Sequence, residues 1–279
     1  MPFIGALPER AHIFRPSPRS DVAVSDAAAW RLSPGHRHIY DKLSVALEAG
    51  LTAAPCGVDP RDCGIAADAM VFVKPMTNLA GMALGARAVR ADAVPIEPGS
   101  FWCERLTGEQ TSSDCLVRNG EPVWLIHTRA SAERAAERPL VWEVGAVSAE
   151  LDALVGSWVR RNLSGYSGLC NLELIGGQPI EAHLRGSNGF FDLYGPGFVP
   201  AWVALMDGEP VTLPPPAPGG FVISVFGEGE PDARRVAAAE ALGVQVQADP
   251  HTPDRMAILR CGDKAVGLEA RDLLLGTRG

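Results

Sequence analysis

The sequence lacks several features that would assign a chain of 279 residues to a class at once. It contains no basic block and has a net charge of −8, so a nucleic-acid partner is not expected. It has no signal peptide at its start and no apolar run of membrane-spanning length, so we expect a cytoplasmic protein with no membrane partner. Its six cysteines form no Cys-x-x-Cys pair, which argues against structural zinc and fits a reducing compartment.

Common catalytic fingerprints are also missing. Neither GxxxxGK[ST] nor GxGxxG occurs, and no Gly-x-Ser-x-Gly elbow supports a hydrolase triad. What remains is an ordinary globular composition, with 47% hydrophobic and 21% charged residues. The length therefore predicts one large domain or two closely joined domains.

Hydrophobic periodicity predicts mixed helices and strands. We expect helices over 38–50, 146–162, 233–242 and 268–275. We expect strands over 69–74, 101–104, 115–117, 123–127, 221–226, 244–247 and 256–260, with Asn119-Gly120 as a hairpin turn. These elements divide the chain into an N-terminal segment with a helix (1–68), a central core (69–205), and a linker with a small α/β subdomain (206–279).

The most informative segment is 170–185, in which apolar and polar residues alternate on both sides of a Gly-Gly pair. It predicts a β-hairpin. A three-residue loop over 176–178 sorts polar and apolar side chains onto opposite faces, whereas a two-residue loop would set the acids against apolar side chains. The resulting cross-strand pairs are Glu173 with Glu181 and Asn171 with His183.

Like charges directly opposite each other destabilise a strand pair, so this register indicates a cation between the two carboxylates. Hard oxygen ligands on a rigid hairpin, with Arg185 beside them, suit Mg²⁺ that carries a phosphorylated ligand. The alternative is a surface hairpin whose charges are solvated.

A second chemical signal lies at Lys74, which ends an apolar strand and precedes a loop of small residues over 77–85. The ammonium can meet a phosphate as a point charge while N–H groups of the loop cap the phosphate oxygens. The alternative is an exposed lysine at the end of a strand.

The order of these parts resembles the ATP-grasp superfamily of ligases over residues 36–190. A helix with Asp41-Lys42 precedes the Val-Lys-Pro strand, a meander with Glu104 and Glu109 follows, and the acidic hairpin comes last. Residues 181–185 are similar to the family's Glu-x-Asn-x-Arg strand. The resemblance implies an α+β fold in which two lobes of antiparallel sheet enclose a nucleotide cleft, with a short N-terminal segment and a small C-terminal α/β subdomain.

The resemblance also implies ATP and Mg²⁺ as cofactors and assigns roles to individual positions. Lys42 and Lys74 would contact the phosphates of the nucleotide, and Thr77, Asn78 and Gly81 would belong to the loop that covers them. The main chain at Glu104 and Leu106 would lie beside adenine, and Glu109 would hold the ribose. Glu173 and Glu181 would bind the metal, with Asn171 and His183 as further ligands. Arg185 and Lys74 are the implied catalytic residues, Arg185 stabilising the transferred phosphoryl group.

Two departures from the family pattern bear on function. His183 stands where the family has asparagine, and the segment before Lys42 is too short for the usual substrate domain. We therefore expect substrate recognition to be reduced, supplied by the C-terminal subdomain, or delegated to a second copy in a homodimer or to a protein partner. The expected activity is ATP- and Mg²⁺-dependent ligation, in which a small-molecule or peptide carboxylate is activated as an acyl phosphate for attack by an amine or similar nucleophile. A kinase and a non-catalytic binding module are the alternatives.

Overall fold

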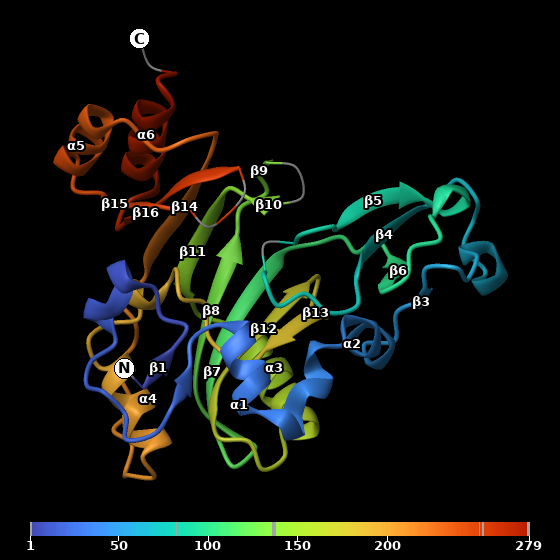
Figure 1. Ribbon diagram of the computed structural model, residues 1–279, viewed down its shortest axis with the longest axis horizontal. Coiled ribbons are helices and arrows are strands. Elements are labelled where there is room, and N and C mark those ends of the chain that lie inside the picture. The colour runs from blue at the N-terminus through green and yellow to red at the C-terminus, as the bar shows by residue number, and fades with distance from the viewer. Residues whose placement is uncertain (1, 82, 136–137, 251, 253, 278–279) are drawn as a thin grey trace.

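Two antiparallel sheets of unequal size organise the computed structural model, which describes residues 2–81, 83–135, 138–250, 252 and 254–277. The larger sheet has the strand order β13-β12-β7-β8-β11-β14-β16-β15, and the smaller has the order β3-β6-β4-β5. Figure 1 shows the smaller sheet as a separate lobe beside the larger one. The predicted α+β architecture with two lobes is therefore confirmed.

The elements have the following bounds. The large sheet contains β7 (Gln110–Arg118), β8 (Glu121–Ala130), β11 (Val141–Ala146), β12 (Gly168–Ile175), β13 (Gln178–His183), β14 (Gly220–Phe226), β15 (Gln245–Ala248) and β16 (Arg255–Cys261). The small sheet contains β3 (Ala53–Pro55), β4 (Met70–Pro75), β5 (Arg87–Arg90) and β6 (Ser100–Glu104). The α-helices are α1 (Asp26–Leu32), α2 (Lys42–Glu48), α3 (Ala149–Asn162), α4 (Phe198–Met206), α5 (Ala233–Ala241) and α6 (Lys264–Leu275). Two further pairs of short strands are β1 (Phe3–Ile4) with β2 (Val22–Ala23) and β9 (Arg134–Ala135) with β10 (Arg138–Pro139).

The large sheet is packed on both faces because its strands alternate side chains between them. On one face, Leu172 of β12 belongs to a core cluster with Trp158 of α3. On the other face, Leu169 joins a cluster that contains Phe198 and Trp202 of α4. The polar residues of β12 share the second face, beyond the part that α4 covers.

The C-terminal part of the chain extends the large sheet. Strands β14, β16 and β15 follow β11 in the ladder, and α5 and α6 pack on them around Ile223 and Leu259. The segment predicted as a small α/β subdomain therefore shares a sheet with the central core.

Two predicted helices begin later than expected. The first begins at Lys42 and not at residue 38, because Asp41 accepts hydrogen bonds from the N–H groups of Leu43 and Ser44 at its N-terminus. Residues 34–40 form a 3₁₀ turn. The second begins at Ala149, after the capping residue Ser148, and the preceding residues 141–146 form β11, which the sequence did not predict. In the part of the chain that the structure describes, no helix combines the length and the apolar character needed to cross a membrane.

Candidate active site

The predicted hairpin forms, and its acidic register is as expected. Glu173 pairs with Glu181, and Asn171 pairs with His183. The loop is different: Ile175 pairs with Gln178, so the turn has two residues, Gly176 and Gly177, both with positive φ. This conformation fits the type I′ turn of a two-residue hairpin.

A β-bulge restores the acidic register after this shorter turn. Leu174 pairs with Pro179 while Glu173 pairs with Glu181, which leaves Ile180 as the extra residue. A three-residue loop over 176–178 would have set Leu174 opposite Ile180, so the predicted loop and this pairing were wrong. Proline cannot donate a ladder hydrogen bond, and β13 is an edge strand, where such a bulge is tolerated.

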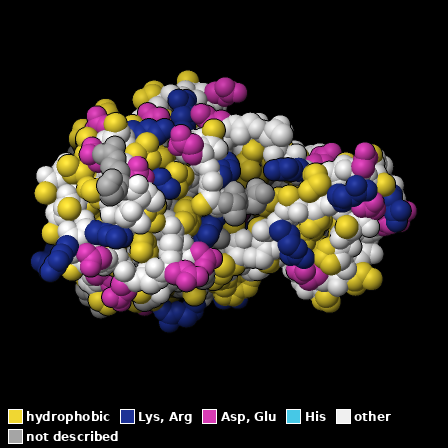
Figure 2. Space-filling view, turned by 90° about the horizontal axis from the view of Figure 1, so that it is seen from above, with side chains coloured by type: hydrophobic (Ala, Val, Ile, Leu, Met, Phe, Trp, Pro, Cys, Tyr) yellow, Lys and Arg dark blue, Asp and Glu magenta, His cyan; other side chains and the backbone are white. Residues whose placement is uncertain are grey.

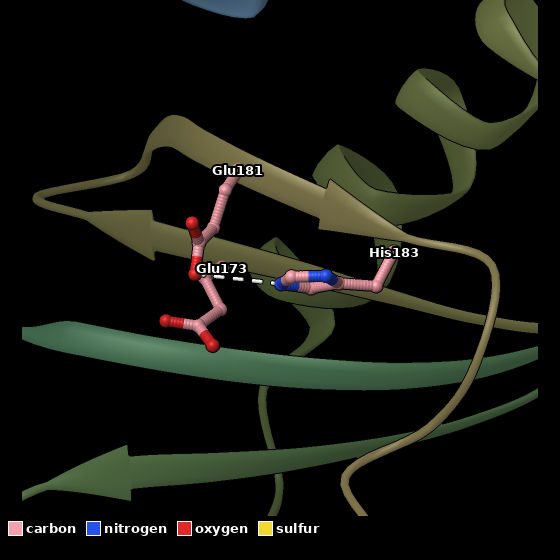
Figure 3. Close-up of side chains that lie close together, drawn as sticks. All are labelled: Glu173, Glu181 and His183. Carbon is pink, nitrogen blue, oxygen red and sulfur yellow. Dashed lines mark ion pairs between the residues drawn. The ribbon is translucent and has the colours of Figure 1, made fainter. Parts of the chain in front are cut away.

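Three side chains converge on one face of this hairpin. Ligand atoms of Glu173, Glu181 and His183 all lie within 4.8 Å of one another. Figure 3 shows that the two carboxylates and the imidazole face one another, with Glu181 and His183 on the same strand. His183 is 1% exposed, and its Nε2 makes no hydrogen bond with a described residue, although Glu181 Oε1 lies 3.4 Å away. This donor set fits a divalent cation, since carboxylates bind Mg²⁺ and imidazole binds transition metals.

The two glutamates differ in acidity. Burial and the neighbouring Glu181 both raise the pKa of the Glu173 carboxyl. Burial acts in the same direction on Glu181, but the Lys42 ammonium and the His183 imidazole hold the pKa of Glu181 well below its usual range. Glu181 is therefore ionised most readily, and a cation that reached the pair would relieve the repulsion felt by Glu173.

Two buried lysines approach the hairpin from the small-lobe side. Lys42 forms an ion pair with Glu181 Oε2. Lys74 donates a hydrogen bond to the carbonyl of the bulged residue Ile180 over 3.0 Å, and its Nζ lies 5.5 Å from the centre of the Phe101 ring. Burial lowers the pKa of Lys74. Lys74 therefore links β4 of the small sheet to β13 of the large sheet.

A cavity of about 260 Å³ lies between the two lobes. Both lysines, Glu173 and Glu181 line it, and so do residues of the strand and loop at 103–106. Most of its remaining wall is apolar and is formed by Phe72, Pro75, Ala83, Leu84, Ala86, Ile175 and Ile180, while Gly108, Gln110 and Arg134 complete the lining. Figure 2 shows the two unequal bodies from above, with a narrower region between them. A cavity with an apolar side and a cationic end suits a ligand that carries both a ring and phosphates.

Several predicted nucleotide contacts line this cavity and others do not. Glu104 and Leu106 line it, although the Glu104 carboxylate also accepts hydrogen bonds from Thr52. Glu109 lies outside the lining and pairs with Arg129 at 3.4 Å. Ala83 and Leu84 of the predicted phosphate loop line the cavity. The loop residues that were expected to contact the nucleotide, Thr77, Asn78 and Gly81, do not line it. Met82 of this loop is outside the described residues.

Arg185 is held by a residue that the sequence did not single out. Asp26 of α1 accepts hydrogen bonds from Arg185 Nη2 at 2.8 Å and Nε at 3.1 Å, and it lies 3.0 Å from His183 Nδ1. Burial would raise the pKa of Asp26, but Arg185 and His183 lower it well below its ordinary value. The structure therefore places Arg185 and His183 on one buried carboxylate from the N-terminal segment.

Asn171 lies in a second buried network on the same face. Its Nδ2 donates to Asp114 Oδ1 at 2.7 Å and to Ser112 Oγ at 2.8 Å. Asp114 also accepts from the main-chain N–H of Ser187 at 2.8 Å and from Tyr194. Asp114 thereby fixes the segment after Arg185 against β7. The other amide atom of Asn171, Oδ1, has no hydrogen-bond partner among the described residues.

A second cavity, also of about 260 Å³, adjoins the first. Gln110, Glu173 and Glu181 line both. The far wall of the second cavity combines two arginines, three aromatic rings and polar groups, namely Arg138, Arg255, Trp142, Phe190, Phe226, Ser187, Asn188 and Ser224. The acidic pair thus lies at the junction of two cavities.

The chain has the ATP-grasp fold, in which a cleft lies between two unequal lobes of antiparallel sheet. It is similar to carboxyaminoimidazole ribonucleotide synthase from Aspergillus clavatus complexed with ATP, with a TM-score of 0.65, 11% identity, and coverage of 98% of this chain and 87% of that chain. It is also similar to phosphoribosylamine–glycine ligase from Thermotoga maritima, with a TM-score of 0.59, 12% identity and coverage of 95% and 81%. The L-amino acid ligase from Bacillus licheniformis gives a TM-score of 0.57, 14% identity and coverage of 89% and 75%. Neither a family model nor a curated protein matches the chain.

The position of Lys74 leads to a first prediction. If the cavity binds ATP, as the resemblance implies, Lys74→Met is expected to weaken that binding by roughly 10- to 100-fold, because a charge-assisted hydrogen bond contributes about 1.5–3 kcal/mol. The melting temperature should fall little, since methionine fills a similar volume and removes a buried ammonium whose pKa is already lowered. Calorimetric titration with ATP and thermal unfolding measure the two effects.

Lys264 provides the matched control. It is half exposed and lies 3.9 Å from Glu133 on the surface, so Lys264→Met should bind ATP like the unchanged protein. Equal ATP affinity in Lys74→Met and the unchanged protein would mean that Lys74 only joins the lobes.

Proposed function

We propose that the protein is an ATP-dependent ligase that activates a substrate carboxylate as an acyl phosphate for attack by an amine. The observation that carries this proposal is the junction of two cavities at Glu173 and Glu181. A module that only binds a nucleotide needs one cavity, whereas ligation needs a second one beside the phosphates. The ligases named above share the fold, which supports the same kind of reaction here.

In this proposal the first cavity holds ATP. The apolar wall with Phe72 and Leu106 takes the base, and Lys42 and Lys74 face the phosphates. Glu173 and Glu181 would hold a divalent cation, which would neutralise negative charge on the phosphates. Binding of that cation would compete with the ion pair between Lys42 and Glu181 and would free the lysine for a phosphate oxygen.

The second cavity would hold the acid. Arg138, whose guanidinium lies 4.3 Å from the centre of the Phe226 ring, suits a carboxylate. Arg255 is paired with Asp249 at 2.6 Å and would take part only by sharing its charge, while the neighbouring rings suit an apolar side chain of the substrate. A carboxylate oxygen attacks the γ-phosphorus, the bond to the bridging oxygen breaks, and ADP leaves. The amine nitrogen then attacks the acyl carbon, phosphate leaves with the acyl-oxygen bond electrons, and the nitrogen gives up a proton. The protein contributes positioning and charge neutralisation. The acceptor acid, the amine and any homodimer or protein partner stay predictions.

Hydroxylamine provides the test. With ATP, a divalent cation and a panel of amino acids, peptides and small acids, the protein should release ADP and phosphate and form a hydroxamate from the correct acid. Hydroxylamine intercepts an acyl phosphate by the same attack that the amine makes. Omission of the acid should stop ADP release, and Lys74→Met should reduce it strongly.

The other outcomes identify the alternatives. A stable phosphorylated product without hydroxamate would indicate a kinase. ATP binding without consumption across the panel would indicate a non-catalytic module and would overturn the proposal.

A further inference from the structure

We propose that His183 is a metal ligand and that it shifts the preference of the acidic site from Mg²⁺ towards a first-row transition metal such as Mn²⁺. This inference deepens the proposed function and rests on it only for the role of the metal. Asp26 acts as the positioning residue that holds the imidazole in the orientation and tautomer needed for ligation.

The imidazole is fixed from one side and open on the other. His183 Nδ1 lies 3.0 Å from Asp26 Oδ1, and the His183 side chain is almost completely buried. Its Nε2 faces the glutamates and has no hydrogen-bond partner among the described residues. In a neutral imidazole this buried nitrogen carries a lone pair that faces two carboxylates, with Glu181 Oε1 only 3.4 Å away, and a cation between them would satisfy all three groups.

The partner of Nδ1 determines which nitrogen carries the lone pair. Asp26 also accepts two hydrogen bonds from Arg185, which keeps its carboxylate ionised. An ionised carboxylate can only accept, so Nδ1 must donate its proton to Asp26. In a neutral imidazole the lone pair is then on Nε2, which points towards Glu173 and Glu181. A carboxylate that orients a ligating histidine in this way is a recurring feature of metal sites.

The donor set then favours one class of metal. Mg²⁺ prefers oxygen ligands and keeps much of its water, whereas first-row transition metals accept imidazole nitrogen readily. The imidazole therefore gives a transition metal a third ligand besides the two carboxylates, whereas it contributes little to the binding of Mg²⁺. Asn171 Oδ1, opposite His183 and also without a partner among the described residues, is a further oxygen on this face.

A different arrangement explains the same contacts without a metal. A protonated His183 would donate from Nδ1 to Asp26 and from Nε2 to Glu181, and would join the two carboxylates as a structural cation. The two arrangements predict opposite spectroscopic results, because only a ligating imidazole places its nitrogen in direct contact with the metal.

The experiment uses the full chain and Mn²⁺ alone, without nucleotide. Electron spin-echo spectra of bound Mn²⁺ should show modulation from a directly coordinated ¹⁴N nucleus, and the modulation should change when the protein is made with ¹⁵N-histidine. Competition titrations should show a preference for Mn²⁺ over Mg²⁺. In His183→Asn this preference should fall by at least about tenfold, and the nitrogen modulation should disappear.

The controls separate this inference from folding and from the proposed function. His127, a buried histidine bonded to Ser113 and Asp152 on the opposite face, provides the matched variant His127→Asn, which should keep the nitrogen signal. The isotope experiment needs no variant, so it decides the matter even if His183→Asn does not fold.

Three results would overturn the inference: no bound Mn²⁺, bound Mn²⁺ without nitrogen modulation, or modulation that persists in folded His183→Asn. If the protein joins an acid to an amine with Mg²⁺ and gives no nitrogen signal, the proposed function stands and this inference is refuted. If it gives the nitrogen signal but has no ligase activity, this inference stands and the proposed function is refuted.

Discussion

Glu173→Gln is expected to stabilise the protein in the absence of metal and to remove most of the metal-dependent nucleotide binding proposed above. The carboxyl of Glu173 is buried opposite Glu181, and both facts raise its pKa above its ordinary value of 4.5. Glutamine keeps the shape and removes the like charge, so the free energy of unfolding should rise by about 0.5–1 kcal/mol at pH 7. The cation loses one charged ligand, so its affinity should fall by at least about tenfold.

The gain in stability should depend on pH in a defined direction. Well below pH 4.5 the carboxyl of Glu173 is protonated in both the folded and the unfolded chain, so Glu173→Gln should have little effect there. As the pH rises above 4.5, the unfolded chain ionises first, and the unchanged protein loses stability relative to the variant. Urea unfolding between pH 4 and 8 measures this difference.

Glu181→Gln should lose metal binding as well, but with the opposite effect on stability. Its carboxylate pairs with Lys42, whose side chain is 8% exposed, so the substitution leaves a buried ammonium without its counter-charge. We expect a loss of about 1–3 kcal/mol. Glu121→Gln, at an exposed pair with Arg160, is the control and should change neither property. Equal stability changes in the two hairpin variants would refute the unequal charge distribution described above.

The hairpin shows how far a strand pattern predicts a site. Alternation predicts that Glu173 and Glu181 share one face, because a single register separates polar from apolar residues. The turn length and the β-bulge that produce this register could not be predicted from alternation alone. Two glycines in the turn favour a two-residue loop, and the bulge at Ile180 then compensates. The proline at 179 is the local signal for such an irregularity on an edge strand.

The bulge also explains why the position of Lys74 could be predicted only in part. An apolar strand that ends in Lys-Pro predicts a lysine that either meets a phosphate or is exposed, and only the resemblance places it in a cleft. Its hydrogen bond joins Lys74 to the carbonyl of Ile180, more than a hundred residues away in sequence. Such a contact depends on how the two sheets pack, which periodicity does not describe.

Asp26 belongs to the candidate site but could not be predicted from the sequence. It lies in a short helix, with no pattern of charged residues around it, and acts 157 and 159 residues away from its own position. Conversely, the family pattern assigned Glu109 to the nucleotide, whereas the structure pairs Glu109 with Arg129. In both cases the partner is set by tertiary packing and not by local spacing.

Asp26→Asn is expected to lower the free energy of unfolding by about 3 kcal/mol. The substitution leaves two groups of a buried network, Arg185 and His183, without their shared counter-charge, and breaking a buried ion pair from one side typically costs about 3–5 kcal/mol. Because the pKa of Asp26 is lowered, its contribution should be complete above its ordinary value of 3.8 and should be lost as the pH falls further. Urea unfolding at several pH values measures both features.

A double-mutant cycle identifies the source of this loss. If the cost of Asp26→Asn comes from the unpaired guanidinium, the double variant Asp26→Asn/Arg185→Met should lose less stability than the sum of the two single variants. We expect the difference to be about 0.5–3 kcal/mol. Asp92→Asn, at the exposed pair with Arg90, should change stability by no more than about 0.5 kcal/mol. Strict additivity would show that Arg185 does not depend on Asp26 for its place. Asp26 would then serve the imidazole alone, and Arg185 would be free to turn towards Glu173, with which it already interacts electrostatically.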